Sequence, residues 1–220
     1  MTTTKITLET NIVKAHLLIA PKSDIRYYLN GVYVDVANRR LVSTDGHCLL
    51  VTRFNDACIE GDSCESFIIS RDQLTIGLKA CLKGMPIVIE YTQADNYLDA
   101  EGRSCRPSPT LTVCNFSGSP VDGKYPEYHR VVPTTINNEL AQFNPELANC
   151  VSEALQLACN SKKNSPTLFH NGNNPGVMIL GSESFGVVMP LRCDVTSSAA
   201  LAMVDDIMGR NQAEPTEVAA

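Results

Sequence analysis

The side chains most able to carry out acid–base chemistry near neutral pH are four histidines, His16, His47, His129 and His170. One of them ends the segment Ser43-Thr-Asp-Gly-His47, which places a hydroxyl, a carboxylate and an imidazole close together in the chain. Successive side chains of an extended strand point to opposite faces, so these groups are not expected to meet as a catalytic triad. The sequence also lacks the motifs GxSxG, GxGxxG and HExxH and the phosphate-binding loop. We therefore expect a protein that is not an enzyme and has no catalytic residue.

Nine cysteines are the other candidates for chemistry, but their spacing does not indicate a metal site. No two of them form a CxxC pair, and none has a histidine partner at the spacing of a zinc finger. The odd number and the lack of an export signal also argue against a disulfide framework. We expect buried free thiols, no metal and no cofactor.

The composition indicates a folded protein. Eighteen Lys and Arg against 24 Asp and Glu give a net charge of −6, and 44% of the residues are hydrophobic. These values exclude a disordered chain and a uniformly basic nucleic-acid coat, although one locally basic face remains compatible with DNA binding. There is no apolar run long enough to span a membrane, and the first residues do not lead into a signal sequence. We expect a soluble, cytoplasmic protein with no membrane partner.

Hydrophobic periodicity predicts three helices, at residues 10–20, 71–83 and 145–158. In the last of these, apolar residues at spacings of four, four and three form a single stripe. The expected ends are Thr10 and Pro21 for the first helix, Gly84 for the second, and Asn144 with Pro145 for the third.

Extended segments separate these helices. They are predicted at residues 32–36, 41–44, 48–51, 66–70, 86–91, 97–99, 110–116, 140–143, 167–169, 177–180 and 185–189. The order strand, helix and three strands occurs three times, which indicates a degenerate internal repeat of βαβββ units. We predict an α+β fold with antiparallel sheets and helices on one face. The expected domains are 1–133, with two units, 134–193, with a third unit, and 194–220, with a helix in 194–210 and a tail.

Four segments of the chain resemble the bacterial beta sliding clamp, the beta subunit of DNA polymerase III, and they occur in the same order. They are Asp24-Ile-Arg-Tyr-Tyr-Leu-Asn-Gly31, Ser43-Thr-Asp-Gly-His47, Val121-Asp-Gly-Lys-Tyr-Pro-Glu-Tyr-His-Arg-Val-Val-Pro133 and Val187-Val-Met-Pro-Leu-Arg192. Residues 7–133 resemble the middle domain of that family, and residues 140–192 resemble the last half of its final domain. The expectation is a shortened clamp with a DNA-clamp-like fold.

The resemblance implies a processivity factor that encircles double-stranded DNA without reading its sequence. It implies a homo-oligomer whose partners are DNA polymerase, repair proteins that carry a clamp-binding motif, and a clamp loader. Three units per chain would require four chains to reach the twelve units of a family ring. The residues expected to face DNA are Lys14, Arg71, Lys79 and Lys83. Charge alone favours solvated helix faces for these residues, and only the resemblance makes a DNA-facing role as plausible.

The resemblance also implies a pocket that binds peptides of partner proteins. Matching the motifs residue by residue gives Leu29, Thr44, Gly46, His47, Leu49, Pro126, Arg130, Val131, Val187, Val188, Met189, Pro190, Leu191 and Arg192. Apolar and methionine side chains would form the walls, and the cationic groups would bind peptide carbonyls or a carboxylate. The chain departs from the family at Cys48, where an arginine is common, which implies an altered partner preference or affinity. It also departs at His129, where a basic residue is common, which implies a weaker local positive charge.

Two other interpretations stay open on the sequence. The chain could be a peptide-binding adaptor or decoy that forms no ring and competes for clamp-binding motifs, or a remnant with little function. The mass of the assembly in solution separates a ring from an adaptor, and cooperative folding argues against a remnant.

Overall fold

The computed structural model describes residues 1–61, 64–82, 84–98, 101, 103–192 and 197–208. Contacts divide the chain into two units, Met1–Pro190 and Leu191–Ala220. The first unit contains three α-helices and all of the described strands, and the second contains the helix α4 (Ser197–Ile207). The rest of the predicted tail, and the predicted DNA-facing residue Lys83, lie outside the described residues.

The three helices of the first unit are α1 (Thr10–Ile19), α2 (Arg71–Ala80) and α3 (Pro145–Ala158). The bounds of α3 are those predicted, and the Asn144 side chain accepts a hydrogen bond from the backbone N–H of Glu146. The N-cap of α1 is Glu9 rather than Thr10, and its side chain makes no capping hydrogen bond.

The second helix begins at Arg71, as predicted, but ends earlier than predicted. Ser70 and Gln73 form a capping box at its start, in which each side chain bonds to the backbone of the other residue. The helix stops at Ala80 with Cys81 as its cap, so Gly84, although its φ is +87°, lies beyond the helix end and does not cap it.

The strands form antiparallel sheets, which confirms the predicted α+β class. Their bounds are β1 (Thr2–Leu8), β2 (Gly31–Asp35), β3 (Arg40–Thr44), β4 (Cys48–Arg53), β5 (Ile59–Gly61), β6 (Phe67–Ser70), β7 (Ile87–Gln93), β8 (Tyr97–Leu98), β9 (Ser104–Cys105), β10 (Thr110–Val113), β11 (Phe116–Gly118), β12 (Thr167–Phe169), β13 (Gly176–Ile179) and β14 (Ser184–Val188). Short 3-10 helices span Tyr27–Leu29, Asp56–Cys58 and Tyr128–Arg130.

Two predicted strands are corrected by the structure. Residues 110–116 form a hairpin of β10 and β11, because Cys114 adopts a left-handed conformation with φ of 53° that turns the chain. Residues 140–143 form no strand and contribute one bridge, between Phe143 and Pro190. The third repeat therefore lacks a full first strand.

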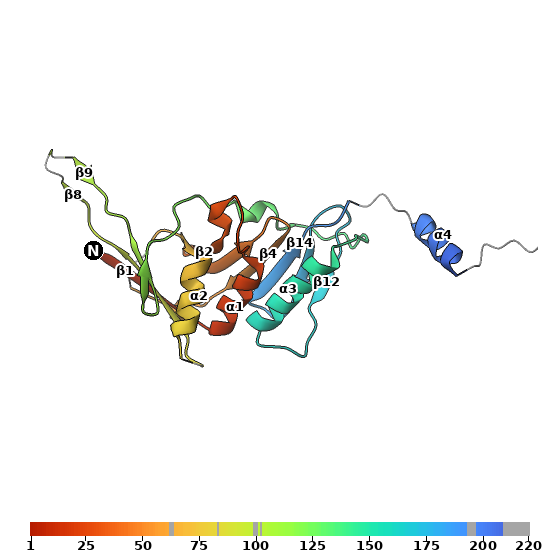
Figure 1. Cartoon of the computed structure of the whole chain (residues 1–220), viewed down its shortest axis with the longest axis horizontal. Coiled ribbons are helices and arrows are strands. Elements are labelled where there is room, and N and C mark those ends of the chain that lie inside the picture. The colour runs from red at the N-terminus through yellow and green to blue at the C-terminus, as the bar shows by residue number, and fades with distance from the viewer. Residues whose placement is uncertain (62–63, 83, 99–100, 102, 193–196, 209–220) are drawn as a thin grey trace, which may run out of the picture. The chain divides into compact units, whose positions relative to one another are not determined.

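Strands of different repeats pair with one another in two large sheets. The first sheet has the order β11-β10-β7-β1-β5, and the second has the order β12-β13-β14-β4-β3-β2-β6. Strand β1 of the first repeat pairs with β7 of the second, whereas β14 of the third repeat pairs with β4 of the first. Figure 1 shows α1, α2 and α3 in a row along one side of these sheets. The opposite face of the second sheet carries the candidate site.

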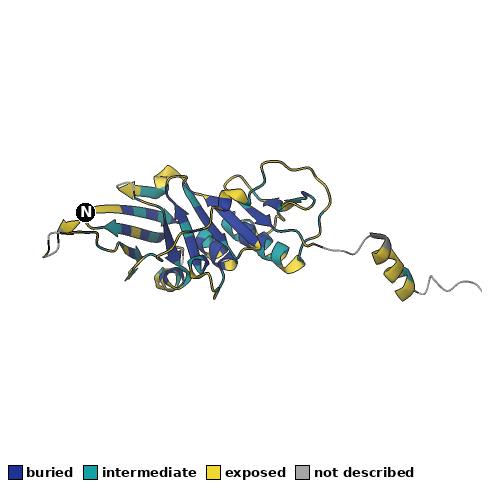
Figure 2. Cartoon of the chain, turned by 90° about the horizontal axis from the view of Figure 1, so that it is seen from above, coloured by how far each residue is buried: buried dark blue, intermediate teal, exposed yellow. Residues whose placement is uncertain are grey.

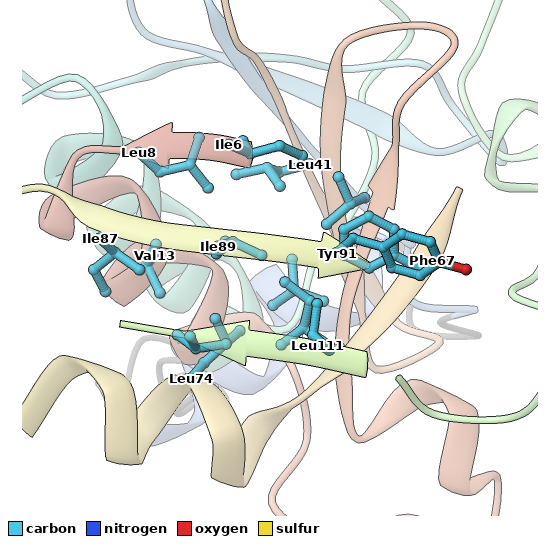
Figure 3. Packing of buried hydrophobic residues seen from close by; sticks show 14 of the residues in the cluster. Ile6, Leu8, Val13, Leu41, Phe67, Leu74, Ile87, Ile89, Tyr91 and Leu111 are labelled. Atoms are coloured by element: carbon cyan, nitrogen blue, oxygen red, sulfur yellow. The ribbon is translucent and has the colours of Figure 1, made fainter. Parts of the chain in front are cut away.

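The core of the first unit is continuous across the repeats. Its largest cluster joins β1, β7 and β10 to α1 and α2, as Figure 3 shows for Ile6, Ile89, Leu111 and Leu74. A second cluster lies between α1, α3 and the second sheet, and a third lies on the outer face of that sheet. Figure 2 shows the buried strand interiors that result, and the mostly exposed surface of α4.

Candidate functional site

An apolar cavity of about 150 Å³ lies on the outer face of the seven-stranded sheet. Four segments that are far apart in the sequence meet there: the 3-10 helix and loop before β2, the β3–β4 turn, the segment after Tyr125, and the end of β14. The lining residues are Arg26, Leu29, Thr44, Gly46, His47, Cys48, Leu49, Pro126, Glu127, Tyr128, Val131, Val187 and Met189.

The floor of the cavity is built by strand pairing. Leu49 of β4 lies opposite Val187 of β14 in the antiparallel register, so both side chains point to the same face of the sheet. Leu29 packs in the same cluster, and all three are at most 2% exposed. Because this register joins the first repeat to the third, the floor exists only when the two repeats are paired.

The β3–β4 turn is held rigidly by side-chain hydrogen bonds. Asp45 Oδ1 accepts from the backbone N–H groups of His47 (2.8 Å) and Cys48 (2.7 Å). Thr44 Oγ1 accepts from the N–H of Gly46 at 3.0 Å. The N–H of Met189 donates to the carbonyl of His47 at 2.9 Å, which fixes the methionine beside the turn. The His47 side chain remains exposed at the rim.

Arg26 covers this turn. Its guanidinium donates to Asp24 Oδ1 (3.0 Å) and Oδ2 (2.8 Å) and to the carbonyl of Asp45 (3.1 Å). These hydrogen bonds hold the pKa of the Asp24 carboxyl at about 2, below its usual value. The φ of Gly46 is +93°, a backbone conformation that favours glycine, and the Arg26 guanidinium packs directly over it.

The remaining wall is held by tyrosines. The Tyr128 hydroxyl donates to Asp35 Oδ2 at 2.8 Å and accepts from Arg40 Nη1 at 3.3 Å. Burial is the main cause that raises the pKa of Tyr128 to about 12. Tyr125 stacks on Tyr33 with ring centroids 4.8 Å apart and planes 6° apart. These contacts anchor the chain on both sides of Pro126.

Cys48 contributes an apolar surface to this site. The residue is 4% exposed, and its thiol donates to Asp45 Oδ1 at 3.3 Å. Burial, reinforced by the Asp45 charge, raises the pKa of the thiol, so the residue stays neutral.

Nine of the fourteen predicted pocket residues line the cavity: Leu29, Thr44, Gly46, His47, Leu49, Pro126, Val131, Val187 and Met189. Arg130 does not, and its guanidinium pairs with Glu127 at 2.7 Å. Val188 points to the helix side, because alternate residues of β14 face opposite sides of the sheet. Pro190 makes the bridge to Phe143, and Leu191 and Arg192 belong to the second unit of the chain.

Sequence reasoning missed four lining residues, Arg26, Cys48, Glu127 and Tyr128. Each lies within or directly beside a segment that carries the family resemblance, so adjacency to those segments was the available signal. Adjacency alone does not say which of the neighbouring side chains turns inward.

The predicted DNA-facing residues have different environments. Lys14 on α1 and Lys79 on α2 are exposed on the helix side. Arg71 is partly buried, and its guanidinium donates to the carbonyls of Leu17 and Ala20 at the C-terminal end of α1. That guanidinium therefore caps the carbonyl groups at the C-terminal end of α1 and is not free to contact DNA phosphates.

The described residues form neither the catalytic triad nor the metal site considered from the sequence. Ser43 is buried and its hydroxyl lies 2.9 Å from His16 Nδ1, so it does not form a triad with Asp45 and His47. The described residues contain no group of three or more His, Cys, Asp and Glu side chains able to hold a metal ion. Among them, no helix combines the length and apolar character needed to cross a bilayer.

Comparison with known proteins identifies relatives of this chain, although no family model matches it. The beta sliding clamp of Pseudomonas putida is 31% identical over 114 residues, which cover 51% of this chain and 28% of that protein. The beta sliding clamp of Vibrio cholerae is 30% identical over 139 residues, 61% of this chain and 34% of that protein. The chain resembles the beta sliding clamps. It matches only about a third of the length of these curated relatives.

Solved structures extend the likeness to the fold of most of the chain. The Pseudomonas aeruginosa DNA polymerase sliding clamp aligns with a TM-score of 0.58 and 19% identity, covering 86% of this chain and 66% of that one. The Helicobacter pylori beta clamp bound to a DNA ligase peptide aligns over the same shares with a TM-score of 0.58 and 13% identity. The clamp fold is thus shared beyond the segments of recognisable sequence similarity.

Proposed function

We propose that this chain acts as a sliding-clamp-like tether, whose pocket captures a short peptide of a partner protein such as a DNA polymerase or a repair enzyme. The observation that carries the proposal is the convergence of four distant segments on one apolar cavity with a rigid polar rim. The Helicobacter pylori clamp, which shares the fold, is bound to a DNA ligase peptide.

The pocket suits the apolar anchor of a flexible peptide. Leu29, Leu49 and Val187 provide a preformed floor, and the unbranched side chain of Met189 can adapt to different ligand shapes. Arg26 and His47 lie at the rim, where their donors can bind peptide carbonyl groups. Because the floor is already buried and the turn is already ordered, binding would cost little reorganisation of the protein.

We further propose that the helix side faces duplex DNA without reading its sequence. Lys14 of α1 and Lys79 of α2 are exposed there, whereas Asp72 of α2 and Glu153 of α3 reduce the net positive charge of this side. Weak, salt-screened attraction to phosphates is what a sliding protein requires, because tight contacts would stop its movement. Arg71 is left out of this set since its guanidinium is bonded to α1.

The peptide proposal is tested by fluorescence anisotropy with a labelled copy of the DNA ligase peptide that the Helicobacter pylori clamp binds. Met189→Glu places a charge in the apolar cavity and should weaken binding at least about tenfold, equivalent to ~1.4 kcal/mol. Met85→Glu is the matched control, because Met85 is 55% exposed and lies outside the cavity. Equal affinities of the wild type and Met189→Glu would reject the assigned site.

The tether proposal is tested separately by native mass spectrometry with and without nicked circular DNA. A ring requires several copies of the 23.9 kDa chain in one particle. A monomer that still binds the peptide would instead make the chain a peptide-binding adaptor or decoy.

A further inference from the structure

A second and larger cavity, of about 710 Å³, lies on the same outer face of the seven-stranded sheet. Its floor is formed by Val51 of β4, Val177 and Ile179 of β13 and Phe185 of β14. Phe185 lies opposite Val51 on one side and opposite Ile179 on the other, so these side chains form a continuous apolar row across three strands. Ile179 keeps 40% of its surface exposed, which leaves this row open to solvent.

The side wall of this groove is the segment 132–136, which contributes Val132, Pro133 and Ile136. Asn171, which is only 3% exposed, holds this wall in place through two hydrogen bonds. Its Oδ1 accepts from the N–H of Asn137 at 3.1 Å, and its Nδ2 donates to the carbonyl of Thr135 at 3.1 Å. The wall is therefore a fixed part of the fold, and the groove is formed before any ligand arrives.

One end of the groove holds the guanidinium of Arg40. Arg40 is partly buried and donates from Nη1 to the Tyr128 hydroxyl at 3.3 Å. Over the part of the chain that the structure describes, no carboxylate forms an ion pair with Arg40. Arg53, which also lines the groove, differs because Glu183 holds it through two hydrogen bonds of 2.8 and 3.0 Å. Among the described residues, the groove thus combines an apolar floor with the guanidinium of Arg40, which no carboxylate pairs.

We propose that this groove is a docking site for a peptide segment of a partner protein in which an acidic residue stands beside bulky apolar side chains. The apolar side chains would cover the row from Val51 to Ile179, and the carboxylate would pair with Arg40. A peptide is favoured as the occupant because Tyr128 borders both cavities, so one extended chain can pass from one to the other. The proposal goes beyond the first pocket, and its choice of a peptide as the occupant rests on the function proposed for that pocket.

The test is a titration of the isotope-labelled full chain, followed by backbone amide NMR signals. The probes are the peptide Ac-Leu-Phe-Glu-Leu-NH2 and its neutral counterpart with Gln in place of Glu. Signals of Val51, Ile179 and Phe185 should shift, and the Glu peptide should bind about fivefold more tightly than the Gln peptide, as a partly exposed ion pair allows. This preference should disappear in Arg40→Gln.

Arg53→Gln is the matched control, since it removes a guanidinium of the same groove that is already paired, and it should keep the preference for the Glu peptide. The proposal is overturned if the wild-type shifts occur only around Gly46 and Met189, or if no signal of the groove shifts. It is also overturned if the preference survives in Arg40→Gln, or if both arginine variants lose it equally. If a variant fails to fold, the signals that shift in the wild type still show whether the peptide binds in the groove.

Discussion

Acid should destabilise this protein through a single buried histidine. His16 is 0% exposed and lies between the hydroxyls of Ser43 (2.9 Å from Nδ1) and Thr52 (3.1 Å from Nε2). Ser184 continues this chain of polar groups with a contact of 3.0 Å to Thr52. Burial lowers the pKa of His16 from 6.5 to about 3, because a charged imidazole would lose its hydration there.

The sign and size of the effect follow from proton linkage. His16 is protonated only near pH 3 in the folded state but near pH 6.5 in the unfolded chain. The folded state is therefore destabilised as the pH falls from 6.5 towards 3. Each pH unit within this window costs about 1.4 kcal/mol. Between pH 6.5 and 4.5 the free energy of unfolding should therefore fall by roughly 2 kcal/mol on account of this residue.

The measurement is urea unfolding at several pH values, followed by tyrosine fluorescence and circular dichroism, for the wild type and His16→Gln. The variant keeps a hydrogen-bonding side chain but has no titrating group, so its stability should fall less steeply, by roughly 2 kcal/mol over this range. Both proteins contain the same carboxylates, so the contribution of carboxylate titration to the pH dependence cancels when the two profiles are subtracted. Parallel pH profiles would refute the reasoning.

Three further predictions concern packing, thiols and DNA. Gly186→Val should lower the free energy of unfolding by about 1–3 kcal/mol in a denaturant titration, because a Cβ there would lie 2.2 Å from Val151 Cγ1. Oxidised glutathione should link Cys81 and Cys114, whose sulfurs lie 3.2 Å apart, through a mixed disulfide that the second thiolate resolves, as peptide mapping would show. Lys79→Glu should weaken retention on nicked circular DNA severalfold at low salt and leave peptide affinity unchanged.

Each of these predictions has its own contrary result. An unchanged unfolding midpoint in Gly186→Val would mean that α3 does not press on β14 as closely as the structure shows. A mixed disulfide that persists on Cys81 without the cross-link would place the two thiols too far apart to react. DNA retention that is equal in Lys79→Glu and the wild type would make that lysine an ordinary surface residue.

Local features were predictable because they depend on neighbours in the chain. The helix Pro145–Ala158 was predicted with its bounds, since a proline at its first position, an asparagine cap and a stripe of apolar residues all agree. The α+β class followed from the repeated order of helices and strands. The break at Cys114 was missed because a single left-handed residue in an otherwise strand-like run leaves no trace in the pattern.

By itself, the sequence determined the helices, most strands and the short segments whose resemblance points to a clamp-like pocket. Only the tertiary structure decided that β14 pairs with β4, so that Val187 faces the pocket while Val188 faces the helices. It also decided that Arg26 covers the β3–β4 turn, that Arg71 caps α1, and that Arg40 ends a second groove. The physical reason is that these outcomes depend on strand register and on long side chains that meet residues far away in the chain, and neither is encoded in local periodicity.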